Sequence, residues 1–66
     1  MEIILNGAPR TLPDDLTLAG LLELLDLGQR RIAVEINQTL VPRSRFPLHQ
    51  LADQDRVEII HAVGGG

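Results

Sequence analysis

Apolar side chains alternate with their neighbours at the start of the chain, which predicts a β-strand over residues 1–5 with its odd-numbered side chains in a core. Asn6 and Gly7 follow, and such a pair is the strongest two-residue hairpin signal, because a type I′ turn needs positive φ at both central residues. The chain is therefore expected to return in a second strand over residues 8–12. Pro9 has no N–H to donate, so this second strand belongs at the edge of the sheet.

The alternating pattern returns in the C-terminal half of the chain. It predicts a third strand over residues 32–36, a turn at residues 37–38 and a short fourth strand over residues 39–41 that a proline ends. The last strand is predicted over residues 56–63, with one face formed by Val57, Ile59 and His61.

Between the second and third strands the apolar residues follow a helical period instead. The leucines recur at i, i+3, i+4 and i+7 and give one face of an amphipathic helix: Leu18, Leu21, Leu22 and Leu25. Thr17 is the expected N-cap, and Gly28 is expected at the C′ position that ends the helix. This face is predicted to pack against the apolar face of the sheet.

No period is visible between residues 43 and 54, so an irregular connection is expected there. Phe46, Leu48 and Leu51 are expected to hold it to the core.

The order of elements is a hairpin, a helix, two short strands and a final strand. One crossover helix is too few for a doubly wound sheet, whereas one helix face on one sheet face gives a two-layer α+β domain. The first and last strands are the most apolar, so we expect them to be central and parallel in a mixed sheet of four to five strands. This is the β-grasp, or ubiquitin-like, arrangement, predicted over residues 1–63 with a glycine tail at residues 64–66.

The composition argues against several classes of function. The 66 residues include no cysteine, which excludes a disulfide, a thiolate metal site and a cysteine nucleophile. The net charge is −3 and the arginines are scattered, so nucleic acid is not an expected partner. No stretch approaches the roughly 20 apolar residues of a membrane span, and no secretion signal is recognised, so no membrane partner and a cytoplasmic location are expected.

Candidate metal ligands and catalytic groups are few. His49 and His61 lack a third clustered ligand, and Asp53 and Asp55 lack the rest of a calcium loop. No pair of a nucleophile and a base is recognisable. We therefore expect neither a metal site nor a catalytic residue, and we expect His61 to be partly buried in its strand.

Three glycines, Gly64, Gly65 and Gly66, follow the last predicted strand. Glycine has no Cβ, so these residues are thin and can extend by roughly 10 Å at about 3.3 Å per residue. We expect this tail to carry the Gly66 carboxylate through a narrow channel into the active site of another protein.

The chain resembles the ThiS sulfur carriers of thiamine biosynthesis over its whole length. The shared pieces are residues 1–7, residues 34–37, Val41-Pro42-Arg43, residues 51–60 and residues 62–66. Each piece alone is weak, but the ordered set ending in Gly-Gly is specific. Where the family usually has glycine between two acidic residues this chain has Gln54, which implies a left-handed glutamine in that turn.

The resemblance implies a carrier rather than an enzyme. An adenylating enzyme would use ATP to convert the Gly66 carboxylate into an acyl-adenylate, and a cysteine desulfurase or another sulfur donor would displace AMP and leave a thiocarboxylate. Thiazole synthase would then take the sulfur for the thiazole ring of thiamine. On this interpretation the ATP belongs to the partner, and the chain binds no cofactor of its own.

Three alternatives remain open at this point. The chain could be the small subunit of a molybdopterin synthase, which shares the fold and the Gly-Gly terminus. It could be a ubiquitin-like modifier that forms an isopeptide bond with a substrate lysine, or a binding module with an inert tail.

A docking surface is expected next to the tail. Strand alternation sends Ile4, Glu58, Ile60 and Ala62 to the sheet face away from the helix, and Val63 adjoins the glycines. Two aliphatic side chains side by side on the central strands suggest a contact for a partner protein. The alternative is that the irregular segment around Phe46 folds over them.

Overall fold

The computed structural model describes residues 1–61, and the predictions for residues 62–66 lie outside that range. Its elements follow one another in the order β1 (Glu2–Leu5), β2 (Ala8–Thr11), α1 (Leu18–Leu24), β3 (Ile32–Ile36), β4 (Thr39–Val41), the 3-10 helix η1 (Arg43–Arg45) and β5 (Arg56–His61). Neither helix in this part of the chain is long and apolar enough to cross a membrane.

The five strands of this range form one mixed sheet in the order β2-β1-β5-β3-β4. β5 lies at the centre, parallel to β1 and antiparallel to β3, and the hairpins β1–β2 and β3–β4 are antiparallel. Pro9 lies in the edge strand β2, as its missing N–H predicts. The predicted two-layer β-grasp fold is therefore confirmed, including the parallel pairing of the first and last strands.

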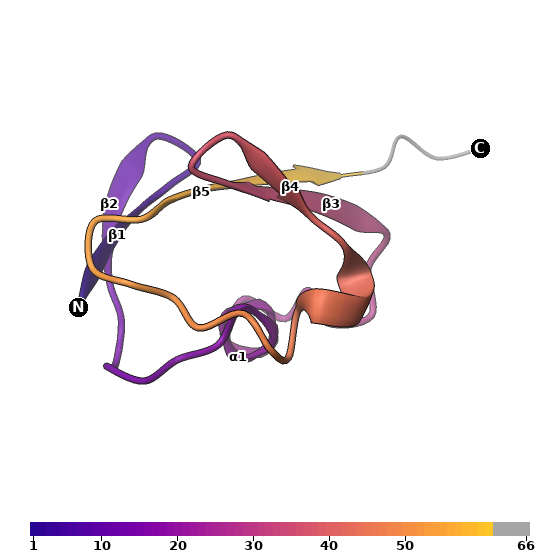
Figure 1. Ribbon diagram of the computed structural model, residues 1–66, viewed down its shortest axis with the longest axis horizontal. Helices are drawn as coiled ribbons and strands as arrows, with labels where there is room; N and C mark the ends of the chain where they lie inside the picture. Colours follow the sequence, from indigo (N-terminus) through magenta and orange to yellow (C-terminus); the bar gives the residue numbers. More distant parts are fainter. Residues whose placement is uncertain (62–66) are drawn as a thin grey trace.

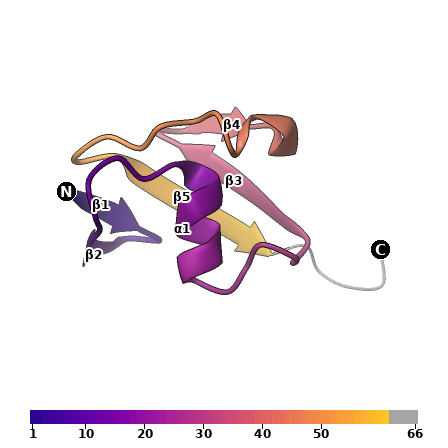
Figure 2. The same ribbon diagram turned by 90° about the horizontal axis from the view of Figure 1, so that it is seen from below.

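The core lies between helix α1 and one face of the sheet, which form two layers in Figures 1 and 2. The Thr17 side chain caps the helix by accepting a hydrogen bond of 3.1 Å from the Gly20 N–H. The predicted helix face is buried at Leu18, Leu21 and Leu22. The sheet contributes buried side chains from four strands: Ile3, Val34, Ile36, Val41, Val57 and Ile59.

Helix α1 ends before the predicted position, and Gly28 does not end it. Asp26, directly after the C-cap, adopts the left-handed conformation with φ of 59°. The Leu27 N–H donates to the Leu22 carbonyl at 2.8 Å, and the Asp26 N–H donates to the Glu23 carbonyl at 3.0 Å, which are the two bonds of a Schellman motif. Leu27 also packs against the core. The helix therefore ends where Leu27 can pack against the core, because aspartate tolerates the left-handed conformation.

The connection between β4 and β5 is more ordered than predicted. It starts with η1, and its backbone then satisfies the first N–H groups of helix α1. Leu18 donates to the His49 carbonyl at 2.8 Å, and Ala19 donates to the Phe46 carbonyl at 3.0 Å. Such N–H groups have no partner within a helix, which explains why this segment adopts a fixed path without a periodic sequence.

The side chains of this connection behave differently from one another. Phe46 and Leu51 are buried as predicted, but Leu48 is 68% exposed, so its predicted role as an anchor is wrong. Arg43 replaces it as a link to the rest of the fold. Its Nη2 donates to the Arg30 carbonyl at 2.7 Å, and its guanidinium lies 5.6 Å from the centroid of the Phe46 ring.

The tight turns contain residues with positive φ. Asn6 (50°) and Gly7 (85°) both have the sign that the predicted type I′ turn needs. Asn37 (52°) and Gln38 (69°) form the second hairpin turn in the same way. Gln54 has φ of 70°, so the expected left-handed glutamine is confirmed.

The asparagines of the two hairpin turns also hold β5 through their side chains. On one edge, the Asn6 Oδ1 accepts a hydrogen bond of 2.9 Å from the Ile59 N–H, beyond the end of β1. On the other edge, the Asn37 Oδ1 accepts one of 3.0 Å from the Arg56 N–H, and the Asn37 Nδ2 donates to the Asp55 carboxylate at 3.0 Å. Both turns therefore fix the central strand as well as reversing the chain.

Leu22 tests the assignment of the buried helix face. Leu22→Ala should lower the free energy of unfolding by about 2–5 kcal/mol, because the side chain is 3% exposed and its removal leaves a cavity. Leu24 of the same helix is 58% exposed, so Leu24→Ala should change this free energy by less than about 0.5 kcal/mol. Denaturant unfolding measures both values, and equal stability of the two variants would show that the helix face is misassigned.

Asn6 allows the side-chain hydrogen bond to be separated from the turn conformation. Asn6→Gly keeps access to positive φ but removes the acceptor for the Ile59 N–H, so we expect a loss of about 1 kcal/mol in the free energy of unfolding. Asn6→Ala should lose about 1–2 kcal/mol more, because alanine is strained at positive φ.

Gln38→Gly is the matched control for Asn6→Gly. Gln38 also has positive φ in a hairpin turn, but the side-chain hydrogen bonds from that turn to Arg56 and Asp55 are made by Asn37. Thermal and denaturant unfolding should give this variant at least the stability of Asn6→Gly. A stable Asn6→Gly protein and a weakened Gln38→Gly protein would contradict the role assigned to the Asn6 side chain.

Candidate functional site

The predicted site consists of the glycine tail and the surface around the strand that leads into it. Gly64, Gly65 and Gly66, together with the predicted docking residues Ala62 and Val63, lie outside the described residues. The structure describes β5, which precedes them, and the sheet around β5.

β5 is held by its neighbours as far as the description extends. Its antiparallel register with β3 reaches His61, which lies opposite Ile32. On the other edge, β1 pairs with β5 at Arg56 and Val57, and the Asn6 side chain extends this contact. Whatever follows His61 is therefore attached to a strand that is fixed in the sheet.

One face of the sheet is open. Among residues 1–61, helix α1, η1 and the connection from η1 to β5 all lie on the other side of the sheet in Figure 1. Phe46 is buried in the core on that side, so the alternative in which its segment covers the docking face is wrong. Ile60 and Leu40 are 50% and 62% exposed. The predicted exposure of Ile60 is therefore confirmed.

The prediction that Ile4 and Ile60 lie side by side is wrong. Ile4 pairs with Arg56 in the parallel register of β1 and β5, whereas Ile60 lies opposite Ala33 of β3. Ile60 lies four positions after Arg56 in β5, which is about 13 Å along a strand. Strand alternation gives the correct face for both isoleucines, but it does not give the register between strands. Ile60 and Ala33 therefore form one apolar row, and Ile4 belongs to another part of the face.

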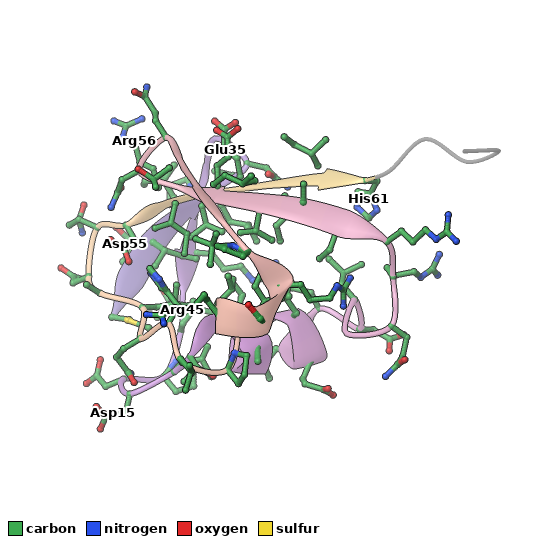
Figure 3. All side chains as sticks on the ribbon, turned by 45° about the vertical axis from the view of Figure 1, so that its right-hand side comes forward. Asp15, Glu35, Arg45, Asp55, Arg56 and His61 are labelled. Carbon is green, nitrogen blue, oxygen red and sulfur yellow. The ribbon has the colours of Figure 1, made fainter. Side chains whose placement is uncertain are left out.

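A cluster of charged side chains lies between these two places. Glu35 and Glu58 are direct partners across β3 and β5, and Leu40 of β4 pairs with Glu35. The two glutamates line a hollow together with Gln38 and Arg56. Figure 3 shows Glu35 and Arg56 on the open side of the sheet. Sequence analysis did not identify this cluster, because alternation places each glutamate on the face and only the register brings them together.

The two aspartates considered as cation ligands accept hydrogen bonds from the backbone. The Glu2 N–H donates to Asp53 at 2.7 Å and holds the pKa of that carboxyl below its usual value, with a smaller contribution from the Gln54 side chain. The Ala52 N–H donates to Asp55 at 2.8 Å. Within residues 1–61, no group of three or more His, Cys, Asp or Glu side chains could hold a metal ion.

His61 is exposed, so the prediction of partial burial is wrong. It alternates in phase with the buried residues Val57 and Ile59, but the end of β5 extends past helix α1 in Figure 2. The strand period therefore gave the correct side of the sheet, whereas the short helix layer leaves this end uncovered.

Comparison with known proteins identifies the family. The family model described as the ThiS family matches residues 3–66. A protein named ycf40 from Porphyra purpurea is 47% identical over the whole chain and 93% of its own length. The sulfur carrier protein ThiS of Escherichia coli K12 is 33% identical, with both chains covered completely. A thiazole synthase of Magnetococcus marinus is 38% identical over the whole of this chain, which covers 20% of that longer protein.

The fold comparison agrees with the sequence comparison. The crystal structure of the thiamine biosynthesis protein ThiS from Geobacter metallireducens superposes with a TM-score of 0.87 at 32% identity, and each chain is covered completely. Family model, relatives and structure all extend over the β-grasp domain and residues 62–66. The chain belongs to the ThiS family.

Proposed function

We propose that this protein carries sulfur for thiazole formation in thiamine biosynthesis, as a thiocarboxylate on Gly66. The main support for the proposal is that this chain is similar over its whole length to the whole of the Escherichia coli protein named sulfur carrier protein ThiS. Membership of the ThiS family favours this pathway over the molybdopterin synthase subunit and the protein modifier. The protein then acts as a carrier and co-substrate, and its partners supply the catalysis.

A carboxylate must be activated before sulfur can replace one of its oxygens. In the proposed sequence, an adenylating enzyme joins the Gly66 carboxylate to the AMP portion of ATP and releases pyrophosphate. The outer sulfur of a persulfide on a cysteine desulfurase or another donor then attacks the acyl carbon, and AMP leaves with the oxygen. A thiol reductant cleaves the S–S bond of the resulting acyl disulfide, which releases the donor and leaves the thiocarboxylate on Gly66. The chain contains no cysteine, so none of its side chains offers a thiol that could carry the sulfur in place of the Gly66 carboxyl group.

The residues that the structure describes fix the place from which the tail starts. β5 is paired up to His61, so the residues that follow it start from a fixed point at one end of the sheet. Gly64, Gly65 and Gly66 have no Cβ, and we propose that they pass through a narrow channel of the partner. We expect the reaction to take place in the cytoplasm.

Thiazole synthase is the partner with independent support. The thiazole synthases of Magnetococcus marinus and Paramagnetospirillum magneticum each contain a segment similar to the whole of this chain. A carrier and the enzyme that consumes its cargo benefit from being joined, because a link raises their effective concentration. The adenylating enzyme and the sulfur donor follow from the chemistry of the proposed reaction.

Removal of the terminal residue tests where the sulfur is carried. Deleting Gly66, or converting its carboxylate to an amide, should abolish sulfur loading by the adenylating enzyme, ATP and a sulfur source, because the acyl group that forms the adenylate is lost or blocked. The melting temperature should not change, because the core lies within residues 1–61. Intact-protein mass spectrometry measures the loading. Sulfur on a protein without Gly66 would contradict the proposal.

Ile60 tests the proposed docking surface beside the tail, to which we also assign Ala62 and Val63. Ile60→Glu should weaken binding to the adenylating enzyme or thiazole synthase at least tenfold, because it places a charge in an apolar contact. Ile4 lies in another row of the face, so Ile4→Glu should have a smaller effect.

The control is Leu24→Glu, which makes the same chemical change on helix α1 in the other layer. Leu24 is about as exposed as Ile60, at 58% against 50%. Titration calorimetry of the folded variants compares their affinities. Equal binding of the Ile60→Glu and parent proteins to both partners would remove Ile60 from the docking surface.

A further inference from the structure

The centre of the open face combines two like charges with an apolar surround. Glu35 and Glu58 are direct cross-strand partners on β3 and β5. Leu40 lies beside Glu35, and the Ile60–Ala33 row follows next along β5 in the direction of the tail. The charged pair therefore lies inside the docking surface, one row away from Ile60.

The two facing glutamates are not expected to stabilise the isolated domain. Like charges directly opposite each other on neighbouring strands repel and lower stability. The repulsion is greater where water is partly excluded, and Glu35 is half-buried. An apolar or oppositely charged pair at these two positions would suit the fold better.

The neighbouring arginine does not neutralise the pair. Arg56 lines the same hollow, yet the ion pair found among residues 1–61 joins the Met1 amine to Asp14 at 2.8 Å, in another part of the molecule. In Figure 3 the Arg56 side chain rises from the sheet to one side of Glu35. Within the described part of the chain, no ion pair is found between Arg56 and either carboxylate.

We propose that Glu35 and Glu58 together bind one arginine side chain on the surface of thiazole synthase; this inference rests on the proposed function. A cross-strand pair of carboxylates suits a guanidinium group, which is planar, always charged and offers five N–H donors. The exposed side chains of Leu40 and Ile60 flank the pair and supply the apolar contact that excludes water around it. The two carboxylates repel each other in the free carrier, and in the complex both are attracted to the guanidinium group.

Thiazole synthase is the occupant to which the proposal commits, because segments similar to this chain occur within two thiazole synthases. The face also adjoins the end of β5, which leads to the tail that must reach the synthase active site. A single charged contact at this place would fix the orientation of the carrier while the tail enters the channel.

The test compares binding of the parent protein and the double variant Glu35→Gln/Glu58→Gln to the thiazole synthase of the same organism. The double variant should bind at least tenfold more weakly, and its affinity should depend less on salt concentration, because the charge-assisted contact is lost. Its melting temperature should be equal to or higher than that of the parent, because the repulsion is also removed. Each single variant should weaken binding by its own factor. The product of these two factors should differ at least threefold from the factor measured for the double variant, because both carboxylates contact one cation.

The matched control is Glu2→Gln/Glu23→Gln, which changes the net charge equally. Glu2 lies at the far end of β1, and Glu23 lies on helix α1. The control should bind like the parent. An equal loss of affinity in the control, unchanged affinity of the Glu35/Glu58 double variant, or additive single effects would each overturn the shared arginine contact.

A second pair of measurements separates this inference from the proposed function. Sulfur loading of Gly66 and binding to thiazole synthase are measured on the parent protein first, and failure of either contradicts the proposed function itself. If the parent passes both, loading by the adenylating enzyme is compared in the double variant. Loss of binding to the adenylating enzyme with intact binding to thiazole synthase would overturn the assignment of the partner.

Discussion

The structure depends on the hydrogen bonding of β5 along both of its edges. β5 pairs with β3 from Val57 to His61 and with β1 at its start, so the last strand of the chain closes the sheet. Parallel pairing leaves β1 too short to reach the second half of β5, because the chain turns at Asn6. The Asn6 side chain takes over at this point, and Asn37 acts in the same way on the opposite edge. Two turn residues thereby set the position of the strand that leads to the functional end of the chain.

Closing the sheet with β5 also divides it into two unlike faces. One face buries its apolar side chains under helix α1 and the connection that follows η1, and this face accounts for the core. The other face has no layer over it in the described residues, and it presents Leu40, Ile60 and a pair of glutamates. A 66-residue chain buries a smaller share of its surface than a larger domain does, so a destabilising contact takes a larger part of its stability. We therefore attribute the pair of glutamates at the centre of this face to a contact with a partner rather than to the needs of the fold.

Much of the fold could be predicted because its signals are local. The Asn6-Gly7 turn, the Thr17 cap, the leucine period and Pro9 each act through a few neighbouring residues. The structure confirms them, except that the last leucine of the period, Leu25, is the C-cap and only partly buried. The helix end could not be placed, because it coincides with the packing of the partly buried Leu27 on the core and because aspartate takes the place of glycine in the left-handed position. The path from η1 to β5 was missed for a related reason, since its order comes from hydrogen bonds to helix α1 across the chain.

The candidate site was predicted less completely than the fold. Alternation gave the correct face for Ile4 and Ile60, but only the register shows that they are separated and that Glu35 meets Glu58. Register depends on pairing between distant segments, and a one-strand pattern contains no information about it. The exposure of His61 and Leu48 likewise depends on how far the helix layer extends, which no local pattern specifies.

The most direct test of the central claim is the mass of the C-terminal peptide after incubation of the protein with the adenylating enzyme, ATP and a sulfur source. The account predicts that one oxygen of the Gly66 carboxylate is replaced by sulfur, and that omission of ATP prevents the replacement. An unchanged C-terminal peptide in an active mixture, or sulfur found on any other residue, would contradict it.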